Sequence, residues 1–158
     1  MYVIKFTNRA AISFSPTEAT KLGRGATASV YKVKHLKQTF AVKLFTDVSK
    51  FNLKKIKDMI ALGEEIKQQG ETDFFQLLAW PQALVEHNGK TTGFAMPVLD
   101  PTEFVGLDSF FDYNLRHNLP NASFKSLSLL CNLIVKFADI LTFLHEKIFM
   151  SSISSLRI

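Results

Sequence analysis

The stretch from residue 21 to residue 33, KLGRGATASVYKV, places two glycines one residue apart ahead of a run that alternates apolar with polar side chains. Without a Cβ, Gly23 and Gly25 can bring backbone N–H groups close to a bound anion, or they can supply a positive φ to an ordinary hairpin turn. In a dinucleotide-binding unit such glycines end a strand and open a helix, whereas here they open a strand. Glycine spacing alone leaves both interpretations open.

A lysine that follows Val30 by thirteen residues adds a second chemical feature. Lys43 lies in the apolar, alternating run TFAVKLF. An ammonium on the inward face of such a strand is costly to bury unless it meets a negative partner, and in a phosphate-binding cleft that partner is the nucleotide. A lysine on a solvent-facing edge is the alternative.

Together, these residues resemble the small lobe of the protein kinases. The family pattern Gly-x-Gly-x-x-Gly-x-Val appears here as Gly23, Gly25, Ala28 and Val30, with Ala28 in place of the third glycine. The family's Val-Ala-Ile-Lys appears as FAVK, residues 40–43. The resemblance implies ATP as the cofactor, a glycine loop over its phosphates, and Val30 packed on the adenine.

The same resemblance gives Lys43 two partners. In kinases this lysine holds the α- and β-phosphates and pairs with a carboxylate on the helix that follows. Glu64 is our first assignment for that carboxylate, because it shares a stripe with apolar helix residues. Glu65 and Asp58 are the alternatives.

The segment GFAMPVLD resembles the hinge between the two kinase lobes. Met96 falls at the gatekeeper position. Pro97 then offers a carbonyl for the adenine amine, and Leu99 keeps the N–H that donates to the ring. The alternative is that Pro97 simply ends a strand.

The elements around these residues are expected to be mainly antiparallel strands. Residues 1–16 alternate as one strand does, and residues 28–36 and 39–45 form an expected hairpin that turns at Lys37-Gln38. A second hairpin is expected at Asn88-Gly89, a strong turn signal, and Pro81 makes its first strand bent or places it at an edge.

One helix is expected between the two hairpins. The pattern changes to helical spacing over residues 49–70, where Ser49 can cap the start and Gly70 can close the end. Its apolar stripe consists of Ile56, Met59, Ile60 and Ile66. The sequence therefore predicts an α+β small lobe over residues 1–99, made of an antiparallel sheet and one helix.

Residues 100–158 are interpreted as the incomplete start of a kinase large lobe. A loop-rich stretch precedes an amphipathic helix, which we expect from residue 126 to about residue 148, capped by Ser123 or Ser126. We expect Cys131 to be buried as a small apolar side chain. In kinases several other helices pack on this one, so its stripe is expected to self-associate or to recruit another chain here. That stripe comprises Leu127, Leu130, Cys131, Ile134, Ala138, Leu141 and Leu144.

The last residues depart from the kinase catalytic loop. The pattern puts Met150 at the usual His, Ser152 at the catalytic Asp and Arg157 at the magnesium-binding Asn. Serine is a poor base near neutral pH, and Arg157 repels magnesium. The sequence stops at Ile158, ahead of the family's Asp-Phe-Gly, so no catalytic residue and no metal ligand is assigned.

The amino-acid composition limits the classes of protein to which this chain can belong. With 158 residues and 47% hydrophobic content, the chain can bury a substantial core. The net charge of +5 is spread along the chain and its local group, SKFNLKKIK, is typical of a solvated helix face, which argues against a nucleic-acid binder. Charged residues interrupt the apolar stretch 127–148, so no membrane span is expected. One cysteine and the absence of a secretory signal favour the cytoplasm.

Three functions remain open at this point. The chain is an ATP-binding lobe of a family that transfers phosphoryl groups to protein Ser/Thr, a pseudokinase or interaction module without turnover, or a gene fragment with no function of its own.

Overall fold

The structure is a computed structural model of the 158-residue chain, and it describes residues 1–70, 78–99 and 127–154. The chain divides into two compact units, Met1–Leu99 and Asp100–Ile158. The first contains a curled antiparallel sheet and one α-helix, and the described part of the second is a single helix. The fold is therefore α+β, as the sequence predicts.

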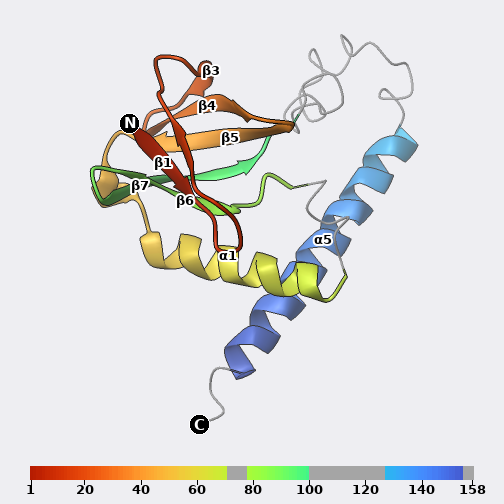
Figure 1. Cartoon of the computed structure of the whole chain (residues 1–158). Helices are drawn as coiled ribbons and strands as arrows, with labels where there is room; N and C mark the ends of the chain where they lie inside the picture. The colour runs from red at the N-terminus through yellow and green to blue at the C-terminus, as the bar shows by residue number, and fades with distance from the viewer. Residues whose placement is uncertain (71–77, 100–126, 155–158) are drawn as a thin grey trace. The chain divides into compact units, whose positions relative to one another are not determined.

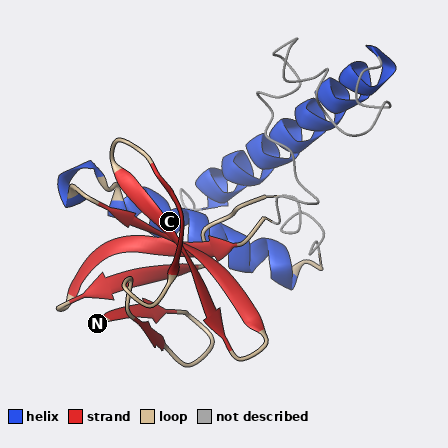
Figure 2. Ribbon diagram, turned by 90° about the horizontal axis from the view of Figure 1, so that it is seen from above, coloured by secondary structure: helices blue, strands red, loops and turns tan. Residues whose placement is uncertain are grey.

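Seven strands form one sheet in the first unit (Figure 1). Their spatial order is β2-β1-β6-β7-β5-β4-β3, and every neighbouring pair is antiparallel. Figure 2 shows that the sheet curls rather than lying flat. The strands are β1 (Tyr2–Lys5), β2 (Ile12–Phe14), β3 (Thr20–Arg24), β4 (Ala28–His35), β5 (Gln38–Phe45), β6 (Ala83–His87) and β7 (Lys90–Pro97).

The N-terminal segment is a hairpin, so the expectation of one strand over residues 1–16 is wrong. The alternation breaks at Thr7, Asn8 and Arg9, three consecutive polar residues that cannot alternate between a core and solvent. These residues lie in the loop between β1 and β2. β1 then pairs with β6, which adds the hairpin to the edge of the remaining sheet.

Both predicted hairpins are present. The β6–β7 turn has φ of 51° at Asn88 and 76° at Gly89, the pair of positive values that a two-residue turn between twisted strands requires. The β4–β5 hairpin turns at Leu36-Lys37, one residue earlier than expected. Leu36 takes a positive φ of 53° there.

Helix α1 (Leu53–Gln68) confirms the predicted helix but starts later. Asn52 caps it, because its side chain accepts a hydrogen bond from the Lys55 backbone N–H at 3.0 Å. Ser49 is not the cap: it belongs to the short 3₁₀ turn η1 (Val48–Lys50), which Asp47 caps. Gly70 follows the helix with φ of 84°, as expected of a closing glycine.

The main core lies on the inner face of the curled sheet. Cross-strand neighbours share a face, so alternate residues of β4, β5 and β7 meet there. Ile4, Val42 and Val85 are fully buried in this cluster. Its buried members are Ile4, Ile12, Phe14, Val33, Phe40, Val42, Leu44, Ala83, Val85 and Ala95.

The second unit contains helix α5 (Leu127–Ser154). It continues past residue 148, so Met150 and Ser152 lie in a helix and not in the loop expected from the kinase pattern; Arg157 lies outside the described residues. No glycine or proline follows Pro120 to end the helix. Cys131 is exposed, which corrects the expectation of burial. Neither α1 nor α5 has a described stretch apolar enough, over a sufficient length, to cross a membrane.

Candidate functional site

The register of the sheet brings four predicted residues onto one face. Val30 of β4 is directly opposite Lys43 of β5, and Ala41 of β5 is directly opposite Met96 of β7. Residues two apart on a strand point the same way, so all four side chains leave the sheet on the face opposite the main core. Val30, Lys43 and Met96 are half-buried there, and Ala41 is buried.

The two glycines stand at the end of this face, and the register of β3 against β4 shifts between Lys21 and Gly23. Gly23 is in β3 and Gly25 begins the turn to β4, where its N–H donates to the Ala28 carbonyl at 2.8 Å. Neither glycine has a positive φ. A Cβ at Gly23 would meet no described atom within 4 Å, and one at Gly25 would only touch the Ala28 oxygen at 3.8 Å.

Neither glycine supplies a positive φ to the β3–β4 turn, as the ordinary-turn interpretation expects. A position that needs glycine shows either a positive φ, as Gly89 does in its turn, or a close backbone approach, as Gly93 does within β7. Gly23 and Gly25 show neither. Ala28, at the third position of the pattern, is 4% exposed and is opposite Phe45, so a side chain is accommodated there within the fold.

Lys43 lies among aromatic rings rather than carboxylates. Its Nζ is 5.5 Å from the centre of the Phe45 ring and 6.0 Å from that of Phe94. Neither of the two described ion pairs involves it. The ring faces stabilise a cation but leave its charge unneutralised, so an incoming anion can pair with it.

Helix α1 packs against part of the same sheet face. Phe51, just before the helix, contacts Phe45 with ring centres 4.9 Å apart. Ile60 and Glu64 of the helix share a hollow with Leu84 of β6. The Trp80 Nε1–H donates to the Met59 carbonyl at 2.8 Å, which ties the helix to the segment entering β6.

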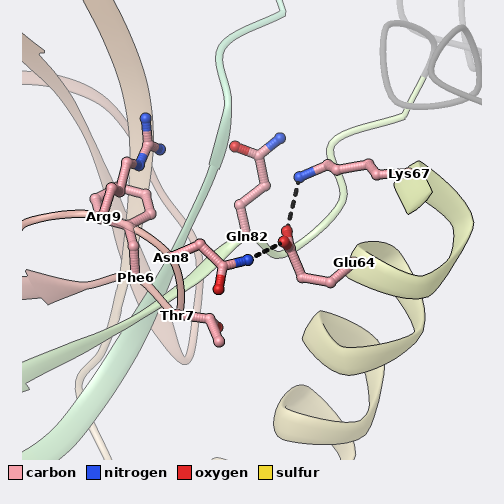
Figure 3. Close-up of a pocket in the computed structure, with 7 residues that line it drawn as sticks. All are labelled: Phe6, Thr7, Asn8, Arg9, Glu64, Lys67 and Gln82. Carbon is pink, nitrogen blue, oxygen red and sulfur yellow. Dashed lines mark hydrogen bonds and ion pairs between the residues drawn. The ribbon is translucent and has the colours of Figure 1, made fainter. Parts of the chain in front are cut away.

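Glu64 has partners other than Lys43 (Figure 3). Asn8 Nδ2 donates to one carboxylate oxygen at 2.8 Å, and Lys67 Nζ contacts the other at 3.0 Å. The carboxylate is thereby held between the β1–β2 loop and the next turn of α1. Pairing of Glu64 with Lys43 stays a prediction. The two alternative carboxylates, Asp58 and Glu65, are both exposed on α1, whereas Glu64 is half-buried.

The predicted hinge residues lie at the end of the first unit. Pro97 is the last residue of β7, opposite Phe40. Leu99 is beyond the strand and 36% exposed, and Asp100 already belongs to the second unit. The carbonyl of Pro97 and the N–H of Leu99 follow Met96 along the chain, which is the order of the hinge pattern.

Sequence reasoning missed a polar pocket at the C-terminal half of α1. It has a volume of about 260 Å³ and is drawn in Figure 3. The Arg9 guanidinium lies 3.5 Å from the centre of the Phe6 ring, and its partial burial lowers the pKa of Arg9 while the charge of Glu64 opposes that shift. The break in alternation at Thr7–Arg9 was the available signal. The lining residues are Phe6, Thr7, Asn8, Arg9, Glu64, Lys67 and Gln82.

The sheet face combines an apolar surface, a cation and an open loop. Val30, Ala41 and Met96 supply an apolar surface, Lys43 supplies a cation without a described ion-pair partner, and Gly23 leaves open space at the loop. Comparison of the chain with protein-family models, with curated protein sequences and with solved structures finds no match.

Proposed function

We propose that the first unit is a kinase-like small lobe that binds ATP on the sheet face formed by Val30, Ala41, Lys43 and Met96. The observation that carries this proposal is the backbone conformation of the two glycines and the open space around them. Gly23 and Gly25 have neither a positive φ nor a neighbour that would exclude a Cβ, and they lie at the end of the face that presents Lys43. A loop that must close on phosphates gives these two positions a reason to be glycine.

Each residue then has a role in binding. The adenine packs between Val30 and the Ala41-Met96 row, and Lys43 pairs with the α- and β-phosphates. Backbone N–H groups of residues 23–28 approach the phosphates, because no Cβ stands in the way at either glycine. At the end of β7 and just after it, the Pro97 carbonyl and the Leu99 N–H hold the polar edge of the base. Magnesium accompanies the nucleotide, and no residue of this chain is assigned as its ligand.

The test is thermal unfolding of the intact chain with and without magnesium-ATP. Ligand at about a hundred times its dissociation constant adds roughly 2.7 kcal/mol to the free energy of unfolding. We expect a rise in the unfolding temperature of the wild type and a smaller rise for Lys43→Ala. Lys90→Ala is the matched control, because Lys90 is an exposed lysine at the start of β7, away from this face of β4 and β5.

Two results would count against the proposal. One is a wild-type chain that unfolds cooperatively at the same temperature with and without the nucleotide. The other is an equal shift in wild type and Lys43→Ala, which would move the nucleotide away from this sheet face.

A second function, association of two copies of this chain through α5, is favoured by the exposed apolar side chains of that helix. Ile134, Phe137 and Leu141 recur at helical spacing and are each at least half exposed, at 57%, 51% and 50%. A stripe of this kind marks an interaction surface. Light scattering over a range of concentrations tests it: we expect association in the wild type and less of it in Phe137→Ser with Leu141→Ser, whereas a monomeric wild type would refute it.

A further inference from the structure

Two neighbouring hollows form one groove across the outer part of the curled sheet. The first, about 390 Å³, has residues 13–15 on one wall and residues 32–34 on the other, and residues 18–20 also line it. The second, about 610 Å³, has residues 9–12 facing residues 35–38. One wall is therefore the continuous stretch 9–15, which contains β2, and the other is the continuous stretch 32–38, which ends β4.

The two walls run in opposite directions. Residues 13–15 of one wall face residues 32–34 of the other, and residues 9–12 face residues 35–38. The residue number thus rises along one wall in the direction in which it falls along the other. β2 and the end of β4 are thus antiparallel strands that line a common gap. They are not paired with each other in the described sheet, whose order places β2 at one end.

Both walls present backbone edges without a strand partner among the described residues. β2 pairs only with β1, so its other edge faces the groove. The β3–β4 ladder extends only to Thr20 opposite Lys32, so Val33–His35 pair with β5 but with no strand on the other side. An extended segment in the gap can form ladder hydrogen bonds with such edges.

The groove is basic. Four cationic side chains line it, Arg9, Lys32, Lys34 and Lys37, against the single carboxylate of Glu18. The Arg9 Nη1–H donates to the side-chain oxygen of Gln38, across the two walls. A neutral amide holds this guanidinium less strongly than a carboxylate would, so an acidic ligand can replace Gln38.

Leu36 is the feature that folding does not explain. It is 94% exposed and has a φ of 53°, in a turn where Gly or Asn would be free of strain. It lines the apolar part of the groove together with Ala10 and Ala11, which are also exposed. Lysines alone would be consistent with protection of an exposed edge against aggregation, but an exposed leucine beside the same edge works against such protection.

We propose that this groove binds an extended acidic peptide of a partner protein as an added strand between β2 and β4. Backbone hydrogen bonds to the two edges provide the affinity, Lys34 and Lys37 pair with acidic side chains, and Leu36 packs on an apolar one. The site is separate from the proposed nucleotide site and does not depend on it.

The experiment selects from a displayed library of random decapeptides on the intact chain. We expect enrichment of sequences that alternate acidic and apolar residues. Binding of a selected peptide, measured by fluorescence anisotropy, should weaken at least about tenfold in Lys34→Glu with Lys37→Glu. The matched control is Lys54→Glu with Lys55→Glu, which carries the same charge change on exposed positions of α1 and should weaken binding by about twofold or less.

Two further measurements separate strand addition from attraction to a basic surface. A selected peptide with N-methyl groups on alternate amides should lose binding, because its ladder donors are removed. Bound peptide should slow hydrogen exchange of amides in residues 12–15 and 33–35.

The proposal is overturned by a selection that enriches no acidic sequence, or by binding that the Lys34 and Lys37 reversals leave unchanged. It is equally overturned if heparin displaces the peptide and the N-methylated form binds as well as the parent. Self-association of the chain that protects these same amides without peptide would assign the groove to a second copy instead.

Discussion

Val30 and Lys43 lie directly opposite each other on β4 and β5, and their side chains leave the sheet on the same face. The turn at Leu36-Lys37 is midway between them in sequence. The separation of the two residues is therefore fixed by the hairpin, since a shift of one residue in the register would send Lys43 into the core. The spacing of the proposed adenine contact and the proposed phosphate contact follows from the length of one hairpin.

Gly23→Ala should separate folding from nucleotide binding. A Cβ at Gly23 meets open space and the residue has no positive φ, so we expect the free energy of unfolding to be unchanged or raised by about 0.5–1 kcal/mol. The stabilisation by magnesium-ATP should fall, because the new methyl group stands between the loop and the phosphates. Thermal unfolding with and without nucleotide measures both quantities. Undiminished stabilisation by ATP would show that the loop does not close on phosphates.

Gly93→Ala, in contrast to Gly23→Ala, should destabilise the fold. Its Cβ would overlap the Lys43 carbonyl oxygen and lie 3.0 Å from the Lys43 carbonyl carbon and 3.2 Å from the Leu44 Cα. These are backbone atoms of the neighbouring strand, so β5 and β7 must separate. We expect a loss of about 1–3 kcal/mol or more in the free energy of unfolding, measured by chemical denaturation. A stability equal to that of the wild type would contradict the close approach of the two strands.

Double-mutant cycles test the partners of Glu64 in the unliganded chain. Because Asn8 contacts the Glu64 carboxylate, Asn8→Ala and Glu64→Gln should be non-additive by about 0.5 kcal/mol or more in the free energy of unfolding. Lys43→Ala and Glu64→Gln should add to within roughly 0.5 kcal/mol, since no ion pair joins them. Clear coupling between Lys43 and Glu64 without nucleotide would show that the carboxylate already faces the sheet.

The sequence predicted those elements whose signals are local. Asn88-Gly89 specifies its turn by φ alone, and the alternation around Lys43 specifies a strand and its two faces. These features depend on a few adjacent residues, so neighbouring parts of the fold do not alter them. The register that places Val30 opposite Lys43 was not predicted, because the turn lies at Leu36-Lys37, one residue earlier than the expected Lys37-Gln38.

The features that the sequence did not reveal include one contact between distant residues and two misplaced helix ends. Asn8 and Glu64 are 56 positions apart, and nothing in either segment indicates that they meet. The cap of α1 shifted from Ser49 to Asn52 because Asp47 engages Ser49 in a preceding 3₁₀ turn. The end of α5 was misplaced because a family pattern outweighed the lack of any helix-breaking residue after Pro120.

The pKa of Asp47 should lie below the ordinary aspartate value of 3.8. The Ser49 hydroxyl donates to its carboxylate at 2.6 Å and the Ser49 backbone N–H at 3.0 Å, and both bonds favour the charged form. A depressed pKa in the folded state means that this stabilisation is present above the unfolded-state pKa and is lost as the pH falls through the folded-state pKa. An NMR titration of the side-chain carboxyl carbon measures it. Ser49→Ala should raise the value, and an unchanged value would show that the Ser49 hydroxyl does not lower the pKa.

Leu36→Asn should raise the free energy of unfolding and weaken peptide binding in the groove. The positive φ of Leu36 costs a leucine roughly 1 kcal/mol, whereas asparagine tolerates this conformation, so we expect a gain of about 0.5–1 kcal/mol in the free energy of unfolding. Peptides selected on the wild-type groove should bind more weakly, because an exposed apolar contact is removed. Leu22→Asn is the control, since Leu22 is 48% exposed in β3 without a positive φ and should give no such gain. Unchanged peptide binding in Leu36→Asn would remove Leu36 from the interface.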